Sequence, residues 1–150
     1  MRIPGENRVR IGDAAGAFVD ASVLFTAAHN PNGKAALVIE LSRWESFSLA
    51  TSAYAREEAI RNLDRKAPEA IVRMNTFLKS LRLVEHRPDA PFPVALVEKD
   101  RPIFQAALGW GASHHLTGDL KHFGPLMKQP CETHGIVVQT VAQFLESVAK

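Results

Sequence analysis

The sequence has almost no cysteine and no long apolar run. Cys131 is the single cysteine among 150 residues, which excludes an intrachain disulfide and leads us to expect a reducing compartment. A lone cysteine also lacks the neighbouring cysteines that a structural zinc site needs. No apolar run approaches the ~20 residues of a membrane helix, and the first residues lack the apolar segment of a signal peptide. We therefore expect a cytoplasmic protein with no membrane span.

Strong net charge and internal repetition are missing as well. Lysine and arginine number 18 against 16 aspartate and glutamate residues, a net charge of +2, which suits an anionic partner without requiring one. A chain of 150 residues is long enough for one well-buried core. We expect a single domain over residues 1–150, with residues 1–16 as a flexible N-terminal extension.

Short apolar segments alternate with longer segments of helical spacing along the chain. Strands are expected at residues 17–19, 47–50, 114–117 and 136–139. The segments between them place apolar residues at helical spacing, as over residues 34–44. This alternation is typical of an α/β fold with a mainly parallel sheet.

Residues 96–123 are expected to bring two aspartates to one edge of this sheet. Asp100 stands at a helix N-terminus, and Gly109 and Gly111 are expected to end that helix about 15 Å away. A strand of about 16 Å then leads back to Asp119. Both carboxylates therefore belong to the edge at which open α/β sheets place their ligands.

Two further acids are expected near the same edge. Asp20 follows the first strand, and Glu58 lies on the helix that follows the second. On that helix Glu57 points away from the apolar face, whereas Glu58 and Asn62 lie at its border, so Glu58 is the acid placed to face a cleft. At about 4 Å and an effective dielectric constant of about 20, each pair of carboxylates repels by about 4 kcal/mol. A cation relieves this repulsion, and oxygen ligands favour Mg²⁺ or Mn²⁺ over zinc.

Such a site indicates metal-dependent hydrolysis of a phosphodiester, because a carboxylate-held ion activates water and stabilises the leaving oxygen. The plainer interpretation is that the acids are helix caps and surface ion pairs, as most aspartates and glutamates are. Spacing by itself does not decide between these two interpretations.

Four stretches resemble the PIN domain family, in this order and at this spacing. They are FVDAS at 18–22, SAYAREEAIRNL at 52–63, KDRPIFQAAL at 99–108 and HLTGDLKHF at 115–123. The later IVVQTVAQFL at 136–145 looks like that family's last strand and helix, so the resemblance spans about residues 17–148. It implies a three-layer α/β/α fold and a metal-dependent ribonuclease. Many bacterial members are VapC-type toxins of type II toxin–antitoxin pairs, held by a cognate antitoxin.

The resemblance also implies roles for particular residues. The acids that match its catalytic, Mg²⁺- or Mn²⁺-binding positions are Asp20, Glu58, Asp100 and Asp119. Ser22 and Thr117 match small polar residues that would orient the carboxylates, and Asn62 would contact Glu58 or the substrate. The basic residues that flank the acids and could contact phosphate are Arg101, Lys121 and His122.

His114 and His115 invite a metal interpretation that their spacing disfavours. Adjacent residues of a strand face opposite sides of the sheet, so the two imidazoles cannot easily share one ion. We expect half-buried strand histidines.

Other functions remain open at this point. A phosphotransferase with Asp20 as nucleophile is disfavoured, because Ser22 stands where such enzymes usually carry a second aspartate. A catalytically silent PIN-like module for a protein partner or a homodimer stays open, and so does a nuclease for structured DNA. RNA is the expected substrate from the resemblance, although no contact to a 2′-hydroxyl can be read from the sequence.

Overall fold

A parallel five-stranded sheet runs through the middle of the computed structural model, which describes residues 16–44 and 47–149. The strand order is β3-β2-β1-β4-β5, and all four pairings between neighbours are parallel. The strands are β1 (Gly16–Val19), β2 (Ser48–Ser52), β3 (Arg82–Val84), β4 (His114–Leu116) and β5 (Val137–Gln139). The α/β class with a parallel sheet is confirmed.

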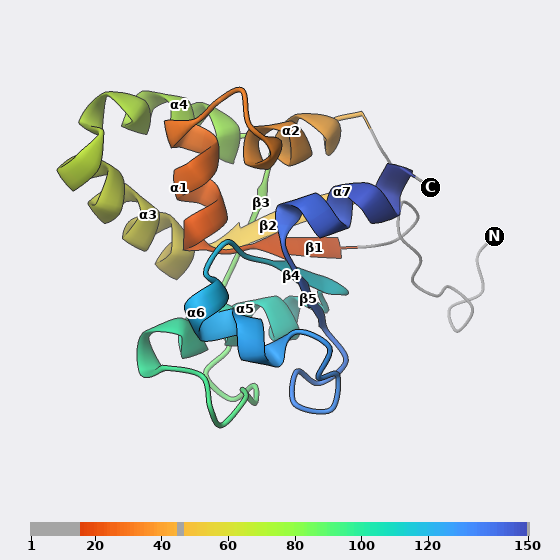
Figure 1. Ribbon diagram of the computed structural model, residues 1–150. Coiled ribbons are helices and arrows are strands. Elements are labelled where there is room, and N and C mark those ends of the chain that lie inside the picture. Colours follow the sequence, from red (N-terminus) through yellow and green to blue (C-terminus); the bar gives the residue numbers. More distant parts are fainter. Residues whose placement is uncertain (1–15, 45–46, 150) are drawn as a thin grey trace.

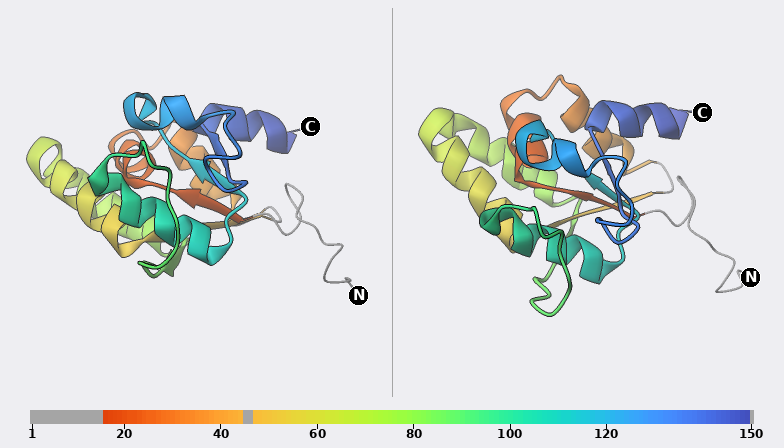
Figure 2. Two further views of the ribbon diagram at one scale, coloured as in Figure 1. Left: turned by 90° about the horizontal axis from the view of Figure 1, so that it is seen from below. Right: turned by 60° about the horizontal axis from the view of Figure 1, so that its bottom comes forward.

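Helices cover both faces of this sheet (Figure 1). On one face lie α1 (Ala21–His29), α2 (Lys34–Leu41), α3 (Ala53–Lys66), α4 (Ile71–Leu78) and α7 (Val141–Ala149). The other face carries α5 (Arg101–Trp110) and α6 (Leu120–Phe123), and the view from below in Figure 2 places α5 in front of the strands. Short 3-10 helices are η1 (Pro68–Ala70), η2 (Glu98–Asp100) and η3 (Gly124–Leu126). The three-layer arrangement is therefore confirmed.

The central strand β1 is buried on both faces, which explains its uninterrupted apolar sequence. Ala17, Phe18 and Val19 of β1 are fully buried, and so is Leu116 of β4. Because β1 lies between β2 and β4, its carboxyl end is enclosed on both sides by other chain segments. The chain leaves β1 at Asp20 directly into α1.

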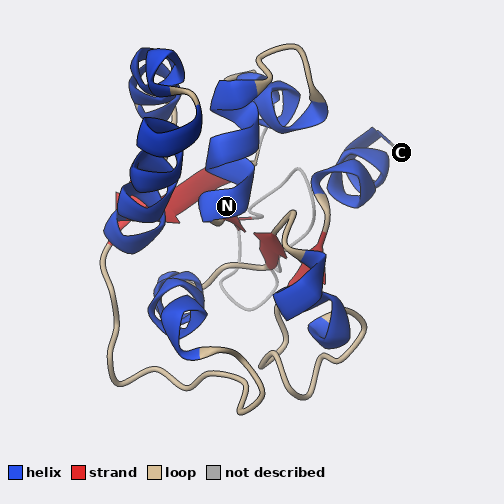
Figure 3. Cartoon of the chain, turned by 60° about the vertical axis from the view of Figure 1, so that its left-hand side comes forward, coloured by secondary structure: helices blue, strands red, loops and turns tan. Residues whose placement is uncertain are grey.

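The strand order reverses direction between β1 and β4. The chain moves outward from β1 to β2 and β3, and then crosses to β4 on the other side of β1. Such a switch point opens a crevice at the carboxyl ends of the two strands, where α/β proteins bind ligands. Figure 3 turns this end of the sheet toward the viewer, with helices on both sides of the strands.

The helix after Asp100 is longer than the sequence predicts. α5 continues through Gly109 to Trp110, and Gly111 ends it in the left-handed conformation, with φ of +88°. The expectation that Gly109 helps to end the helix is therefore wrong. A Cβ on Gly109 would lie 2.3 Å from Cγ of Arg87, so the close passage of that loop explains the glycine.

The expected N-terminal extension overlaps the first strand by one residue. Gly16 is already the first residue of β1, and the remainder of the expected N-terminal extension lies outside the described residues. Within the described ranges, no helix combines the length and the hydropathy needed to cross a bilayer.

Candidate functional site

Two carboxylates and one imidazole converge at the carboxyl edge of the sheet. Nδ1 of His122 lies 2.7 Å from Oδ2 of Asp119 and 3.3 Å from Oδ2 of Asp100. Each of the three residues offers one ligand atom, and these atoms lie within 4.8 Å of one another. Oδ2 of Asp100 is buried and has no hydrogen-bond partner among the described residues, so its lone pairs are available to a cation. This donor set is of a kind that holds a divalent ion.

Asp119 is positioned by capping the short helix α6. Its Oδ1 accepts a hydrogen bond of 3.1 Å from the backbone N–H of His122, while its own N–H donates to Oγ1 of Thr117 at 3.0 Å. One carboxylate oxygen thus serves the helix cap, and the other, Oδ2, is hydrogen-bonded to Nδ1 of His122 at 2.7 Å, where a metal ion could replace the shared proton. Helix capping and a metal site are therefore compatible interpretations of the same aspartate.

Asp20 also caps a helix, and Ser22 links it to the loop after β4. Oδ1 of Asp20 accepts hydrogen bonds from the backbone N–H and the Oγ–H of Ser22, at 3.0 and 2.5 Å. Oγ of Ser22 accepts from the N–H of Gly118 at 2.8 Å and lies 3.5 Å from Oγ1 of Thr117. These bonds join the start of α1 to the segment that carries Asp119. Asp20 itself stands outside the cluster of Asp100, Asp119 and His122.

His115 lies beneath Asp20. Its Nε2 is 3.5 Å from Oδ2 of Asp20, and neither ring nitrogen has a hydrogen-bond partner among the described residues. Burial by itself would raise the pKa of Asp20, but His115, Ser22 and Thr117 outweigh it and hold that pKa below its usual value. Asp20 is therefore kept as a carboxylate inside the fold.

The two adjacent histidines point to opposite faces of the sheet, as expected. The ring of His115 stacks on the rings of Phe123 and of Phe104 of α5, with distances between ring centres of 4.6 Å and 5.9 Å. The ring of His114 packs edge-on against Phe144 of α7 at 5.3 Å. Both histidines are buried rather than half-buried, because helices cover both faces of β4. The expectation of half-buried side chains is therefore wrong.

Lys99 joins Glu58 to Asp100. Its Nζ lies 3.2 Å from Oε2 of Glu58 and 3.8 Å from Oδ1 of Asp100. Burial raises the pKa of Asp100. The positive charge of Lys99 lowers this pKa, but the negative charge of Glu58 raises it again, so the pKa stays above its usual value. Lys99 is not among the site residues that the sequence predicts, although its position directly before Asp100 in KDRP is a usable signal.

Glu58 faces a cleft between α1 and α3. Glu57 is exposed, whereas Glu58 is partly buried. The cleft has a volume of about 220 Å³ and is lined by Ser22, Phe25, Thr26, Glu58, Asn62 and Lys66. The side-chain oxygen of Asn62 accepts a hydrogen bond from Arg65, so in this structure Asn62 is held by its own helix.

The three flanking basic residues have different positions. Arg101 turns away from the acids: its Nε donates to the carbonyl of Leu96 at 2.8 Å, and its guanidinium lies 4.8 Å from the ring centre of Phe92. Lys121 is exposed on the first turn of α6. His122 alone among the three reaches the carboxylates.

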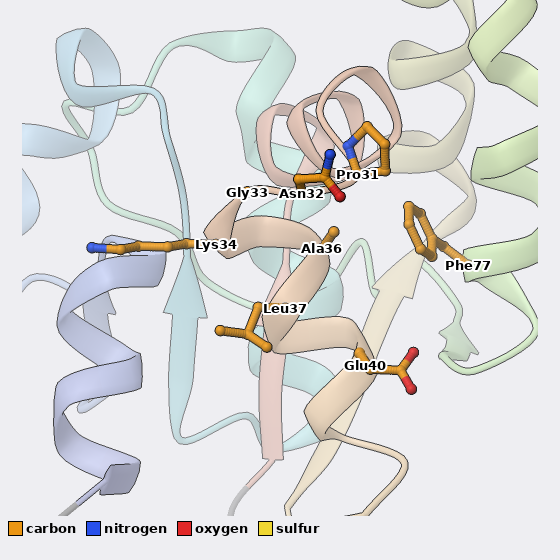
Figure 4. Close-up of a pocket in the computed structure, with 8 residues that line it drawn as sticks. All are labelled: Pro31, Asn32, Gly33, Lys34, Ala36, Leu37, Glu40 and Phe77. Carbon is orange, nitrogen blue, oxygen red and sulfur yellow. The ribbon is translucent and has the colours of Figure 1, made fainter.

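A larger pocket of about 390 Å³ lies elsewhere, between α2 and α4. Figure 4 shows Phe77 of α4 facing this pocket from the side opposite α2. Glu40 is the single acid that lines it, and its carboxylate is already engaged by Trp44 and Arg43. This pocket therefore offers no group of ligands comparable with the cluster at the sheet edge.

Searches against protein-family models and against curated proteins give no match. Solved structures do match. VapBC2 from Rickettsia felis, bound to a DNA fragment from its promoter, superposes with a TM-score of 0.62 at 14% identity, covering 83% of this chain and 98% of that chain. PAE2754 from Pyrobaculum aerophilum superposes with a TM-score of 0.57 at 19% identity, covering 97% of this chain and 98% of that chain. DNA-bound VapBC from Salmonella typhimurium superposes with a TM-score of 0.58 at 14% identity, covering 85% of this chain and 98% of that chain.

The likeness to these structures extends over nearly the whole of each matched chain. The three-layer arrangement and the fully parallel sheet agree with it. The chain therefore has the VapC-like PIN fold that its motifs predict.

Proposed function

We propose that this protein is a divalent-metal-dependent endoribonuclease and the toxin of a type II toxin–antitoxin pair. The observation that carries the proposal is the convergence of Asp100, Asp119 and His122, together with the buried and unpartnered Oδ2 of Asp100. The fold supports the toxin part of the proposal, since two of the matched structures are VapBC structures. An antitoxin protein is accordingly the partner that we propose for this chain.

The residues present fit an Mg²⁺ or Mn²⁺ ion. Asp100 and Asp119 would hold it, with Asp20 and Glu58 completing the acidic surroundings. When bound, such an ion activates water and stabilises the leaving oxygen of a phosphodiester. The chain's own part is to keep Asp20 ionised and to orient Asp20 and Asp119. Ser22 and Thr117 do so through their hydrogen bonds to Asp20 and to the backbone N–H of Asp119.

The cleft between α1 and α3 is the proposed path of the nucleic acid toward the acids. Glu58 lies in its wall, and Lys66 supplies a positive charge there. Asn62 adds an amide that can donate to a phosphate oxygen. Phosphate contacts of this kind position a strand without reading its sequence. The choice of RNA over structured DNA follows the family resemblance.

Cleavage of a mixed RNA pool and of a DNA hairpin tests the proposal. With Mn²⁺ we expect RNA cleavage that EDTA abolishes and that Asp100→Asn lowers about 100-fold or more. Asp89→Asn, at an exposed aspartate in the loop before α5, is the matched control and should cleave like the wild type. Cleavage that survives both Asp100→Asn and EDTA would contradict the proposal. Cleavage of the hairpin alone would reassign the substrate to DNA.

A catalytically silent interaction module is the second candidate. Lys99 favours it, because its ammonium group already supplies a positive charge between Glu58 and Asp100. A silent module does not need to bind Mn²⁺, whereas the nuclease must. Metal binding therefore separates the two candidates without knowledge of the RNA target.

A further inference from the structure

We propose that His122 is a nitrogen ligand of the metal ion and that it makes the site select Mn²⁺ over Mg²⁺. This inference rests on the proposed function and deepens it, because the resemblance implies acids alone as ligands. In the sequence His122 was a candidate phosphate contact. Its position in the structure gives it a different role.

The imidazole is held toward the carboxylates by two features of α6. Asp119 caps the helix, and His122 follows one turn later, so both side chains project to the same side. The backbone N–H of His122 is bonded to Oδ1 of Asp119, and Nδ1 faces Oδ2 of the same residue. The ring nitrogen is therefore fixed at the site by the helix start itself.

The distances suit neighbouring ligands of one ion. A metal–ligand bond of about 2.1 Å in octahedral geometry places adjacent ligand atoms about 3 Å apart. Nδ1 lies 2.7 Å from Oδ2 of Asp119 and 3.3 Å from Oδ2 of Asp100, on either side of that separation. A bound ion would take the place of the proton in the hydrogen bond between Nδ1 and Oδ2 of Asp119, and this proton would be released to solvent. One ion can then contact Nδ1 and both carboxylates.

A second observation points independently to a cation. Asp100 is only 5% exposed, and its Oδ2 has no hydrogen-bond partner among the described residues. A buried carboxylate oxygen without a partner is costly, and a metal ion would satisfy it. The same oxygen is the one that faces Nδ1 of His122.

Imidazole changes which ion the site prefers. Mg²⁺ favours oxygen ligands and gives up its water reluctantly, whereas first-row transition ions accept imidazole nitrogen readily. A site with two carboxylates and one imidazole therefore discriminates against Mg²⁺. Mn²⁺ is the suitable test ion, because its electron spin reports a directly bound nitrogen.

The test is carried out on the full chain with Mn²⁺ and Mg²⁺ alone, without nucleic acid. Calorimetric titration gives the ratio of the two affinities, and pulsed electron paramagnetic resonance detects ¹⁴N coupled to bound Mn²⁺. The variants are Asp100→Asn and His122→Asn. His122→Asn keeps the backbone N–H that donates to the capping carboxylate of Asp119. His134→Asn is the matched control, because His134 is exposed and has φ of 54°, which asparagine accepts. Circular dichroism checks the fold of each variant.

We expect a ¹⁴N coupling in the wild type and in His134→Asn that His122→Asn lacks. The affinity ratio of Mn²⁺ to Mg²⁺ should fall about tenfold in His122→Asn. One outcome would overturn this inference and leave the proposed nuclease intact. In that outcome Asp100→Asn abolishes Mn²⁺ binding, but the wild type shows no nitrogen coupling and His122→Asn has the same affinity ratio as the wild type. A coupling that persists in His122→Asn would also overturn it. No Mn²⁺ binding by the wild type would contradict both proposals.

Discussion

Nζ of Lys99 lies 3.2 Å from Oε2 of Glu58 and joins two segments of the chain that are 41 residues apart. The same ammonium group lies 3.8 Å from Oδ1 of Asp100. One lysine is thus shared by two of the acids that the proposed function assigns to the metal site. Its positive charge stabilises these acids in the metal-free protein and opposes a divalent ion that approaches them.

Replacing this lysine should strengthen metal binding. In Lys99→Met we expect the affinity for Mn²⁺ to rise about threefold, a modest effect because solvent screens an exposed ammonium group. Calorimetry measures the change, with Lys79→Met as the control at an exposed lysine on the far end of α4. A lower affinity in Lys99→Met would mean that the lysine positions Glu58 for the metal instead of opposing the metal.

Asp20 and Asp100 should contribute to stability with opposite signs. The pKa of Asp20 is lower in the folded protein than in the unfolded chain. The ionised carboxylate therefore contributes its full stabilising effect above the pKa of an unfolded aspartate, and this effect is lost as the pH falls through the lower pKa of the folded protein. Asp20→Asn should reduce the free energy of unfolding at neutral pH by about 1–3 kcal/mol. It should also flatten the loss of stability below about pH 4. Urea denaturation at several pH values measures both effects, and equal slopes for variant and wild type would contradict the account.

Asp100 is expected to behave in the reverse way. Its pKa is raised, so the folded protein binds a proton more tightly there than the unfolded chain does, and stability falls as the pH rises through that range. Without metal, Asp100→Asn should therefore melt at a higher temperature than the wild type at pH 7. Thermal melts in EDTA check this, with Asp89→Asn as the control. A lower melting temperature in Asp100→Asn would show that its contacts with Lys99 and His122 outweigh the cost of burial.

Lys66 should affect nucleic acid binding and leave metal binding unchanged. It lines the cleft beside Glu58, and the structure places it 5.7 Å above the ring of Phe25. Loss of one phosphate contact should reduce the slope of log affinity against log salt by about 0.7 for single-stranded RNA. Fluorescence anisotropy over a salt series compares Lys66→Ala with Lys79→Ala. An unchanged slope would place the RNA path elsewhere.

Most of the fold could be predicted from local patterns. The apolar run at residues 17–19 forms the buried strand β1, and the β-branched run at 136–139 contains the edge strand β5, in which Val138 is buried and Val137 is exposed. The helix expected over residues 34–44 ends at Leu41. Gly109 was misinterpreted because its reason is the passage of Arg87, and contacts between distant segments leave no local pattern.

The candidate site could be predicted only in part. The four acids are predicted by motif, and the alternation of strands and helices predicts the places of Asp20 and Asp119, which follow β1 and β4. The contact of Lys99 with Glu58 depends on how η2 packs against α3, which sequence spacing does not show. His115 lies beneath Asp20 because it pairs in register with Phe18, two residues before Asp20, and the sequence does not show this register. Arg101 looked like a phosphate contact, but the loop at Leu96 and Phe92 holds its guanidinium.

The most direct test of the central claim is the calorimetric titration of Mn²⁺ into the wild type and into Asp100→Asn. It requires no knowledge of the RNA target, and it addresses the cluster of Asp100, Asp119 and His122 itself. The account predicts one ion per chain in the wild type and no measurable binding in Asp100→Asn, with both proteins folded. Absence of binding to the wild type, or equal binding to both proteins, would contradict it.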